Sequence, residues 1–517
     1  MKKVTDYYEM NKEIIWKVGI VAVLTGIFSY YLFIVYGYAY PDGLCEGLYY
    51  YHNANWHLAC GKWAVRYLNK IIGNNIVMPL IIVCLYSLCI ALSVLVLRED
   101  WKLKNKSTLL LVTSVMVVTP SAIAHLTYPH VALTFSFAFL LSVLFYFMGH
   151  QKHWTWHILG SCCLCISMGL YQSYIGAAAT LVLLGAVLGL IRGKSWIDTA
   201  KELIRFLILG IAGCALNIII YKFEIYIRGT YISDRVEAFD IVEIFVSLKS
   251  SVVNCYSAFI EYFTDEILKR QYLYMLFAVV AILMLGILLV KMIRDKKYVE
   301  IILSVVLLLL VPVSMNAIHI LIPYNEISML MRYHYVLIIV FGVVIVEQST
   351  LYMGKTFKTK LIGGANIILF GIASTCVITA NATFECLRIS YDAIAVQTGL
   401  ILSDVYDQEG YVPNETPIVF VGFPNDKVSQ ESLEIYKYAI NLVDNPVYWE
   451  DMNGLINCRR QYLLNYCGID PGIFTPEEYY EIISGEEFAE MPLWPADGSV
   501  RNINGMVVVR LSEAAPM

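Results

Sequence analysis

The chain has 517 residues, of which 58% are hydrophobic and 15% are charged, and its formal net charge is −5. Its mean hydropathy is +0.63. Soluble globular proteins carry roughly 25% charged residues, so this composition excludes an ordinary soluble domain and indicates an integral membrane protein. Acidic residues outnumber basic residues, 42 to 37, which argues against a nucleic-acid-binding surface.

Apolar runs long enough to form membrane-spanning helices recur along most of the chain. We expect 11 spans, near residues 18–36, 76–97, 109–124, 131–148, 154–170, 174–191, 206–223, 273–292, 301–318, 335–346 and 361–380. The stretch 154–191 must hold two spans, because one helix of that length would reach about 57 Å, nearly twice the hydrocarbon core. Gly169 and the polar residues 171–173 mark the expected bend.

Lysine and arginine are concentrated in alternate loops, which predicts a cytoplasmic N-terminus. One of these basic loops contains Arg98, Lys102, Lys104 and Lys106. An odd number of spans then places the C-terminus outside the cytoplasm. Two of the loops expected on the outer face are long, at residues 37–75 and 228–271.

The composition changes after residue 380. Residues 381–517 contain 21 acidic and 7 basic side chains. The apolar runs 417–422 and 506–511 have turn residues before them and are typical of strands. Thr475 followed by Pro476 and Glu478 is a helix-start pattern. We therefore expect a transmembrane domain at residues 1–380 and a small extracytoplasmic α/β domain at residues 381–517.

The first outer loop contains a pattern of aromatic and basic residues. Trp56, Trp63 and Tyr67 are spaced for one helix face, with Lys62 and Arg66 beside them. Aromatic rings at headgroup level and cations near phosphates suit a helix that lies on the membrane. A plain connecting helix is the alternative.

Two carboxylates stand near the start of the same loop. Asp42 lies in the sequence Tyr40-Pro41-Asp42-Gly43, and Glu46 follows four residues later. A carboxylate in a short loop at the mouth of a helical bundle is a candidate general base for a sugar hydroxyl. The structural alternative is that Pro-Asp-Gly simply makes a good turn and that Glu46 is a surface charge.

Other polar residues fall at the same expected outer depth. His125, Tyr128 and His130 occupy the link between the third and fourth spans, and Tyr171 and Gln172 interrupt a very apolar stretch. Buried glutamine needs partners and usually faces a cavity or another helix. These five residues are candidates for lining a substrate cavity, although such residues are also common at membrane interfaces.

Arg332 begins the tenth expected span on the outer face, where cations are otherwise scarce. Its guanidinium offers paired donors that match phosphate oxygens. The alternatives are an ion pair with Glu326 or a role as a headgroup anchor.

The spacing of the cysteines and the search for an acidic nucleotide-sugar motif say less about function. Cys45 with Cys60, and Cys458 with Cys467, are two possible disulfide pairs. Two matching pairs of cysteine or histidine at the spacings typical of zinc sites do not occur, so we expect no metal site. We also find no Asp-x-Asp signature of nucleotide-sugar binding, which agrees with a lipid-linked donor.

Taken in order, these elements resemble the bacterial Gtr-type membrane glucosyltransferases, a GT-C-class family that decorates O-antigens and related surface glycans. The resemblance covers most of the chain. It rests on residues 40–42, Gly61-Lys62-Trp63 with Leu68, residues 171–174, residues 331–333 and Asn381.

The resemblance implies a GT-C-like fold, an inverting mechanism, a polyprenyl-phosphate sugar donor, a surface-glycan acceptor and no cofactor. It points to Asp42 as the base. The family often has paired acidic residues here, whereas Glu46 stands four residues away, so the choice between them stays open. Arg332, Arg66 and Lys62 would bind the donor phosphate. The alternatives are a transporter of lipid-linked sugar and a non-enzymatic envelope protein whose acidic tail recruits a partner.

Overall fold

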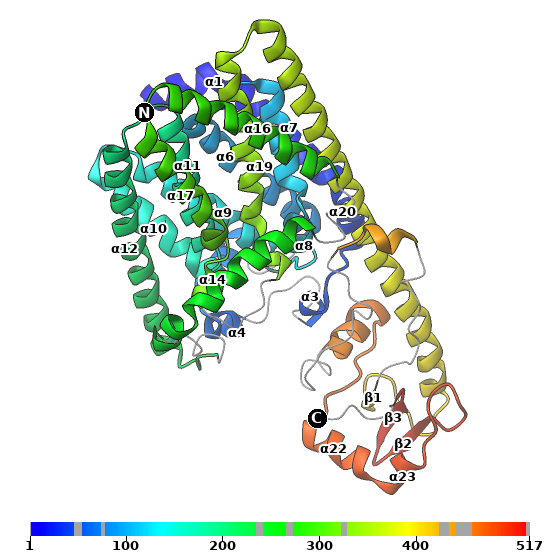
Figure 1. Cartoon of the computed structure of the whole chain (residues 1–517). Coiled ribbons are helices and arrows are strands. Elements are labelled where there is room, and N and C mark those ends of the chain that lie inside the picture. Colours follow the sequence, from blue (N-terminus) through cyan, green and yellow to red (C-terminus); the bar gives the residue numbers. More distant parts are fainter. Residues whose placement is uncertain are drawn as a thin grey trace. The chain divides into compact units, whose positions relative to one another are not determined.

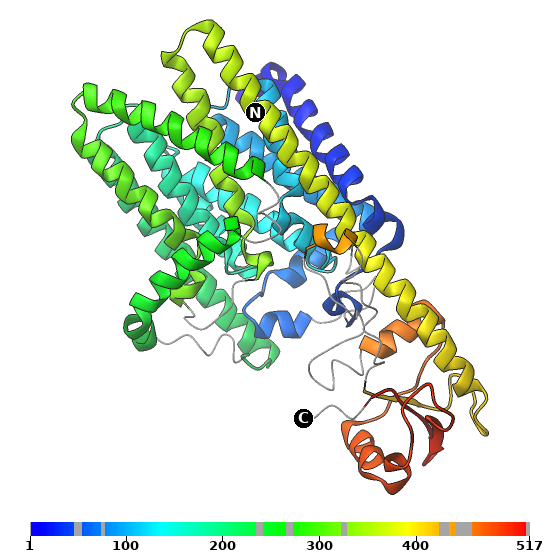
Figure 2. The same cartoon turned by 45° about the vertical axis from the view of Figure 1, so that its right-hand side comes forward.

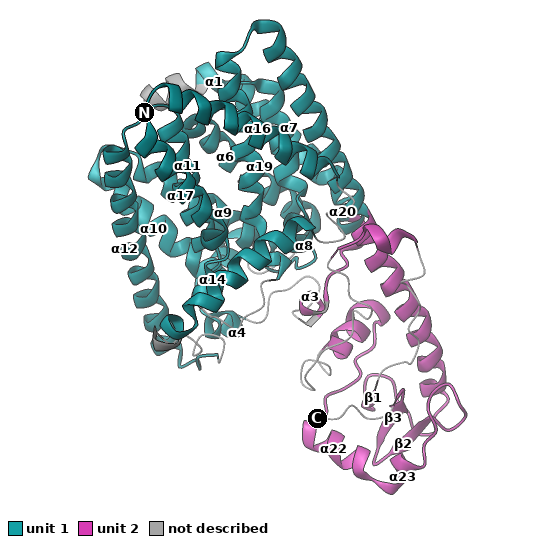
Figure 3. Ribbon diagram, viewed as in Figure 1, with its two compact units in different colours: residues 1–34, 53–381 teal, residues 35–52, 382–517 magenta. Residues whose placement is uncertain are grey.

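The computed structural model describes residues 2–45, 54–73, 78–233, 241–264, 272–321, 328–422, 434–440 and 458–512. The chain divides into two compact units (Figure 3). The first comprises Met1–Ile34 and Asn53–Asn381, and the second comprises Val35–His52 and Ala382–Met517. The second unit thus combines the expected C-terminal domain with part of the first expected outer loop.

The first unit is built of helices (Figure 1). In chain order these are α1 (Lys2–Ser29), α4 (Ala54–Ala59), α5 (Val65–Gly73), α6 (Pro79–Trp101), α7 (Lys106–Val118), α8 (Pro120–Leu126), α9 (Ala132–Gly149), α10 (Trp154–Leu170), α11 (Tyr174–Ile191), α12 (Trp196–Arg228), α14 (Ile241–Thr264), α16 (Tyr272–Arg294), α17 (Tyr298–Met315), α18 (Ile318–Leu321), α19 (Val336–Ser349) and the first part of α20 (Lys355–Tyr406). The 3-10 turns η1 (Met329–Met331), η2 (Tyr333–Tyr335) and η3 (Thr350–Tyr352) flank α19, and α2 (Tyr31–Tyr36) contributes to both units.

The fold is that of a polytopic helical membrane protein. Among the described residues, eight helices are long and apolar enough to cross a membrane, or nine if α7 and α8 form one span bent by 46°. Pro120 at the start of α8 explains the bend, because proline has no N–H to continue the helical hydrogen bonds. The predicted count of 11 is not confirmed: α10 has only 17 residues, and α1 is not among the eight.

Helix α9 lies at the centre of the first unit, where it packs against α6, α10 and α11. Of its apolar window, 78% is buried inside the protein, compared with 17% for α12 and for α16. The outer face of α12 exposes large aliphatic side chains that include Ile204, Leu207 and Ile211. An apolar exposed face of this kind suits contact with lipid.

The predicted bend between residues 154 and 191 is confirmed. Helix α10 ends at Leu170 and α11 begins at Tyr174. Tyr171 adopts an extended backbone, with φ −159° and ψ 113°, so the helical hydrogen bonds stop there. The break brings polar side chains to the end of the bundle.

The expected boundary at residue 380 is not a break in the helix. Helix α20 runs for 52 residues, and Figure 2 shows it as one continuous helix. Asn381 lies inside it, and its side-chain amide donates to the Val377 carbonyl oxygen at 2.9 Å. The end of the apolar run therefore does not coincide with the end of the helix.

The second unit contains a three-stranded sheet in the order β1-β3-β2. Strand β1 (Ile418–Val421) is parallel to β3 (Met506–Arg510), and β2 (Val500–Ile503) is antiparallel to β3. Strands β1 and β3 lie where the sequence predicted them, whereas β2 was not predicted. Helix α22 (Pro476–Ser484) begins with the predicted capping box between Thr475 and Glu478.

Both faces of this sheet are covered, because successive strand residues point to opposite sides. On one face Ile418 and Val507 pack with residues near the end of α20, including Val405. On the other face Val419 and Val508 belong to the core formed with α22 and α23 (Glu486–Ala489). The α20 end is therefore one of the two covering layers of the sheet.

The proposed disulfide pairs are not found. Cys60 and Cys467 are free thiols, which rules out pairing of Cys45 with Cys60 and of Cys458 with Cys467. Cys458 is nevertheless disulfide-bonded. Residues about nine positions apart on a helical pattern are too far apart to bridge, which is the physical reason against the second pair.

Candidate functional site

Most of the predicted site residues lie where short connections meet at one end of the first unit, which we call the α8–α9 end. The α4–α5 connection, the α8–α9 connection, the α10–α11 break and the η1–η2 turn form it. Their predicted site residues are Lys62, Arg66, His125, Tyr128, His130, Tyr171, Gln172 and Arg332.

The α4–α5 connection is fixed against α10 and α12. Gly169 leaves room for the Trp63 ring, because a Cβ at Gly169 would lie 2.4 Å from that ring. The Trp63 indole donates to the Asn217 side-chain oxygen at 2.8 Å, and Trp63 is only 8% exposed. The predicted membrane-surface position is therefore wrong for Trp63, which packs inside the protein against α10 and α12.

A cation and several aromatic rings gather beside this connection. Lys62 Nζ lies 4.9 Å from the centre of the Tyr171 ring. The Gln172 amide donates to the Cys60 carbonyl oxygen at 2.8 Å. The rings of His57 and His130 stack with centres 6.1 Å apart. We call Lys62, His57, His130, Tyr171 and Gln172 the Lys62 group.

The two histidines of the Lys62 group are neutral. Burial and, to a smaller extent, the nearby Lys62 charge together lower the pKa of His130 to about 3. Burial also holds the pKa of His57 well below its usual value, with Lys62 and His130 contributing. At neutral pH the positive charge of this group therefore resides on Lys62. Tyr128 lies beside it, with its ring centre 6.3 Å from that of His130.

Arg66 already has an acidic neighbour. One of its nitrogens donates to the Asn55 side chain at 3.2 Å, and its charge interacts with Glu224. Glu224 in turn accepts hydrogen bonds from the Tyr67 hydroxyl at 2.5 Å and from Arg228 Nε at 2.7 Å. This geometry ties α5 to α12 and leaves Arg66 less suited to a phosphate than an unpaired arginine.

His125 is fully buried and both of its ring nitrogens are engaged. Nδ1 lies 2.9 Å from the Tyr86 hydroxyl and Nε2 lies 3.0 Å from the Leu330 carbonyl oxygen. Its ring stacks on Phe135 at 4.1 Å, and Phe135 meets the Tyr171 ring at 4.9 Å. His125 thus connects the Lys62 group to the η1 turn that precedes Arg332.

Arg332 is half-buried between η1 and η2 and makes no ion pair with any residue that the structure describes. Its Nε is buried and has no hydrogen-bond acceptor. Glu326, the alternative partner, lies outside the described residues. A half-buried guanidinium without a counter-ion is costly, so it indicates a place for an anion.

Of the two predicted carboxylates, Asp42 belongs to the second unit. Asp42 lies in the first turn of α3 (Pro41–Cys45) and is half-buried. Leu44 of the same helix packs in a cluster with Tyr391 and Tyr462, which anchors α3 to α20. Glu46 lies outside the described residues.

His57 and His319 were not predicted from the sequence. His57 lies in an expected outer loop, and His319 lies close to the end of an apolar helix. A position of this kind is what made His125 and His130 candidates in the sequence. Within the described residues, no group of three or more His, Cys, Asp or Glu side chains could hold a metal ion.

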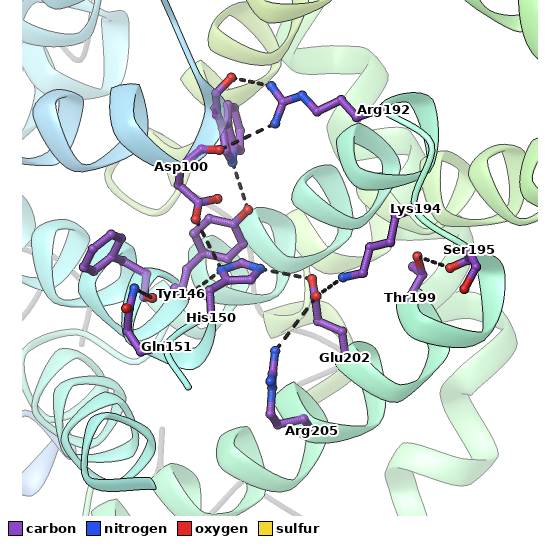
Figure 4. Close-up of polar contacts among 12 residues, drawn as sticks. Asp100, Tyr146, His150, Gln151, Arg192, Lys194, Ser195, Thr199, Glu202 and Arg205 are labelled. Carbon is purple, nitrogen blue, oxygen red and sulfur yellow. Dashed lines mark hydrogen bonds and ion pairs between the residues drawn. The ribbon is translucent and has the colours of Figure 1, made fainter. Parts of the chain in front are cut away.

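A second polar cluster lies at the other end of α9, about 27 Å away for an 18-residue helix. Figure 4 shows His150 between the carboxylates of Asp100 and Glu202, at 3.5 and 3.0 Å. Lys194 also pairs with Glu202, and Arg192 donates to the Trp101 carbonyl oxygen. These contacts join the ends of α6, α9, α11 and α12. They form a closed network, because the charged side chains pair within it, whereas Arg332 has no such partner among the described residues.

This closed network predicts a structural role for Glu202, whose side chain is 12% exposed. Glu202→Gln should destabilise the protein by about 3–5 kcal/mol, because it leaves Lys194 and His150 without their carboxylate. Thermal unfolding of the purified protein in detergent measures this. Glu13→Gln, at a 63% exposed carboxylate paired with Lys17, is the matched control and should change little. Equal effects of the two substitutions would contradict the structural role.

Comparison with known families identifies a match over most of the chain. The family model described as Glucosyl transferase GtrII matches residues 46–390, which is well over half of the chain. The matched region includes the Lys62 group and Arg332, and it begins after Asp42. Neither the curated proteins nor the solved structures gave a match.

Proposed function

The chain belongs to the GtrII glucosyl transferase family and is a membrane glycosyltransferase, and we propose that it transfers glucose from a polyprenyl-phosphate donor to a cell-surface glycan. The proposed reaction takes place at the outer face of a bacterial cell membrane. The family match favours sugar transfer over the alternative of transporting a lipid-linked sugar.

Among the described residues Arg332 has no counter-ion, and this observation carries the choice of donor. A polyprenyl-phosphate sugar has a phosphodiester at the membrane surface, directly before the lipid tail. Arg332 stands at the start of the apolar segment Tyr333–Tyr352. A guanidinium at this level can bind the phosphate while the polyprenyl chain stays in the bilayer.

The proposed reaction is a single inverting displacement. A carboxylate, which we assign to Asp42, removes the proton from the acceptor hydroxyl as its oxygen attacks the anomeric carbon. The bond from that carbon to the phosphate oxygen breaks, and its electron pair stays with the phosphate. Arg332 stabilises the additional negative charge on the departing polyprenyl phosphate.

We assign the Lys62 group, together with Tyr128, to the sugar and acceptor side of the site. Neutral His57 and His130 offer hydrogen bonds without adding charge, and the Tyr171 ring offers an apolar face for a sugar. Lys62 and Arg66 remain candidates for the phosphate. Arg66 is the weaker of the two because of its existing interaction with Glu224.

Two observations support the proposed orientation. The end of the first unit with the Figure 4 cluster contains Arg192, Lys194 and Arg205, as expected for a cytoplasmic end. Cys458 in the second unit is disulfide-bonded, and disulfides persist in oxidising compartments. Both favour a cytoplasmic Figure 4 end and an extracytoplasmic second unit.

Analysis of the surface glycan in a deletion strain tests the proposed function. The strain is expected to lack one hexose side branch, which the gene supplied in trans restores. An unchanged glycan would exclude the proposed acceptor. A glycan lost together with accumulation of the lipid-linked sugar on the inner leaflet would instead support the transporter. Restoration by the second unit alone would support the non-enzymatic envelope protein.

A further inference from the structure

A histidine near Arg332 has an unusual environment. His319 lies in α18, the short helix that follows α17, and it is half-buried. Its Nδ1 atom is buried and has no hydrogen-bond partner. Buried polar nitrogens in native proteins nearly always have partners, so an unpartnered one needs an explanation.

Specific contacts hold the segment before His319 in place. The Asn316 side-chain amide donates to the Cys255 carbonyl oxygen at 3.0 Å, and the Tyr335 hydroxyl donates to the Asn316 side-chain oxygen at 2.6 Å. Asn316 is therefore bonded to both α14 and η2. Because Arg332 immediately precedes η2 and His319 follows Asn316 by three residues, both side chains are held in the same region.

The charge of Arg332 acts on His319, in agreement with the contacts of Asn316 that hold both segments. The pKa of His319 is lowered first by burial and then by the positive charge of Arg332. Arg332 also acts on Tyr262, whose pKa burial raises to about 12, and the Tyr262 ring lies 4.5 Å from that of Tyr335. Residues of α14, α18 and the η1–η2 turn thus surround one small region.

The described residues offer little negative charge to balance Arg332 in this region. Glu261 is the carboxylate that acts on His319, but it is exposed and accepts a hydrogen bond from Ser257 at 3.1 Å. Charges exposed to water are strongly screened. Arg332 makes no ion pair within the described residues. The unpartnered His319 Nδ1 and Arg332 Nε atoms therefore share a partly dry region in which no described residue supplies a paired anion.

We propose that His319 is a second phosphate-contacting residue, which binds the donor phosphate together with Arg332. This inference rests on the proposed function and adds a residue to its site. A neutral imidazole donates one N–H hydrogen bond to a phosphate oxygen. As the bond to the anomeric carbon breaks, the phosphodiester monoanion becomes a monoester dianion, and that hydrogen bond strengthens. The step requires no proton transfer from His319.

The test measures inhibition of transfer by farnesyl phosphate, a short polyprenyl phosphate that resembles the leaving group. His319→Ala should weaken farnesyl phosphate inhibition by about 10- to 100-fold, as expected for a charge-assisted hydrogen bond. His319→Gln keeps an N–H donor and should recover part of that loss. His153→Ala removes an exposed histidine at the opposite end of the first unit and should leave inhibition unchanged.

Comparison ligands separate the possible sources of the phosphate. Farnesol and inorganic phosphate should inhibit much less than farnesyl phosphate, and phosphatidylglycerol should not compete. Equal inhibition of the wild type and His319→Ala by farnesyl phosphate would overturn this inference while leaving the proposed function intact. Equal competition by phosphatidylglycerol would make the region a general headgroup site and also overturn it. If farnesyl phosphate fails to inhibit the wild-type protein, the polyprenyl-phosphate donor itself is contradicted.

Discussion

Asp42→Asn is expected to reduce turnover by about 10²–10⁴-fold, the usual contribution of a general base. The amide has nearly the same shape but cannot accept the proton of the acceptor hydroxyl. Asp42 sits on α3, which Leu44 fixes to Tyr391 and Tyr462, so the substitution should leave the fold intact. The measurement is the rate of glucose transfer at saturating donor and acceptor, with thermal unfolding as the check on folding.

Matched substitutions distinguish the two carboxylates that the sequence left open. Asp42→Glu should retain more activity than Asp42→Asn, because it keeps a base at a displaced position. Glu46→Gln should reduce turnover by less than tenfold if Asp42 is the base. Full activity of Asp42→Asn together with an inactive Glu46→Gln would assign the base to Glu46 instead.

Arg332→Ala is expected to reduce the catalytic efficiency for the donor by about 10²–10³-fold, as removal of a key charge-stabilising donor does. The loss should appear in both donor KM and kcat, because the guanidinium binds the ground-state phosphate and stabilises the departing one. Acceptor KM should change little. Steady-state kinetics with donor and acceptor varied separately measure each effect.

Arg332→Lys is the matched control for charge. Lysine keeps the positive charge but lacks the paired donors of arginine, so it should recover only part of the activity. A change confined to acceptor KM in Arg332→Ala would contradict the assigned role. Full activity of Arg332→Ala would show that Arg332 does not contact the donor phosphate.

Hydropathy and spacing predicted much of the fold. The interruption at Tyr171-Gln172-Ser173 was recognisable because polar residues inside an apolar run mark a break, and the break was found. The capping box at Thr475 was recognisable because its residues have fixed spacing. Strand β2 was missed because its four residues, Val500–Ile503, include polar Arg501 and Asn502.

Hydropathy shows where the apolar surface ends, but a helix ends only where its backbone hydrogen bonds stop. Helix α20 has no proline, and it continues past Asn381 into a polar region without a capping signal. The expected boundary at residue 380 was therefore a change of environment within one helix.

For the candidate site, the sequence indicated the residue types and the loops that carry them, but it did not show which side chains contact one another. From sequence alone, His125 and Arg332 were both polar residues expected at the outer face, and the partners of neither could be predicted. The structure separates them: His125 has a partner for each ring nitrogen, whereas Arg332 has no carboxylate partner among the described residues. Such differences depend on contacts between residues distant in sequence, which periodicity cannot reveal.

The most direct test uses the purified protein in liposomes with glucose-labelled polyprenyl phosphate and the surface-glycan acceptor. We expect the label to move to the acceptor through a new glycosidic bond and polyprenyl phosphate to be released in equal amount. Movement of the labelled lipid across the bilayer without bond formation, or transfer from a nucleotide sugar alone, would contradict it.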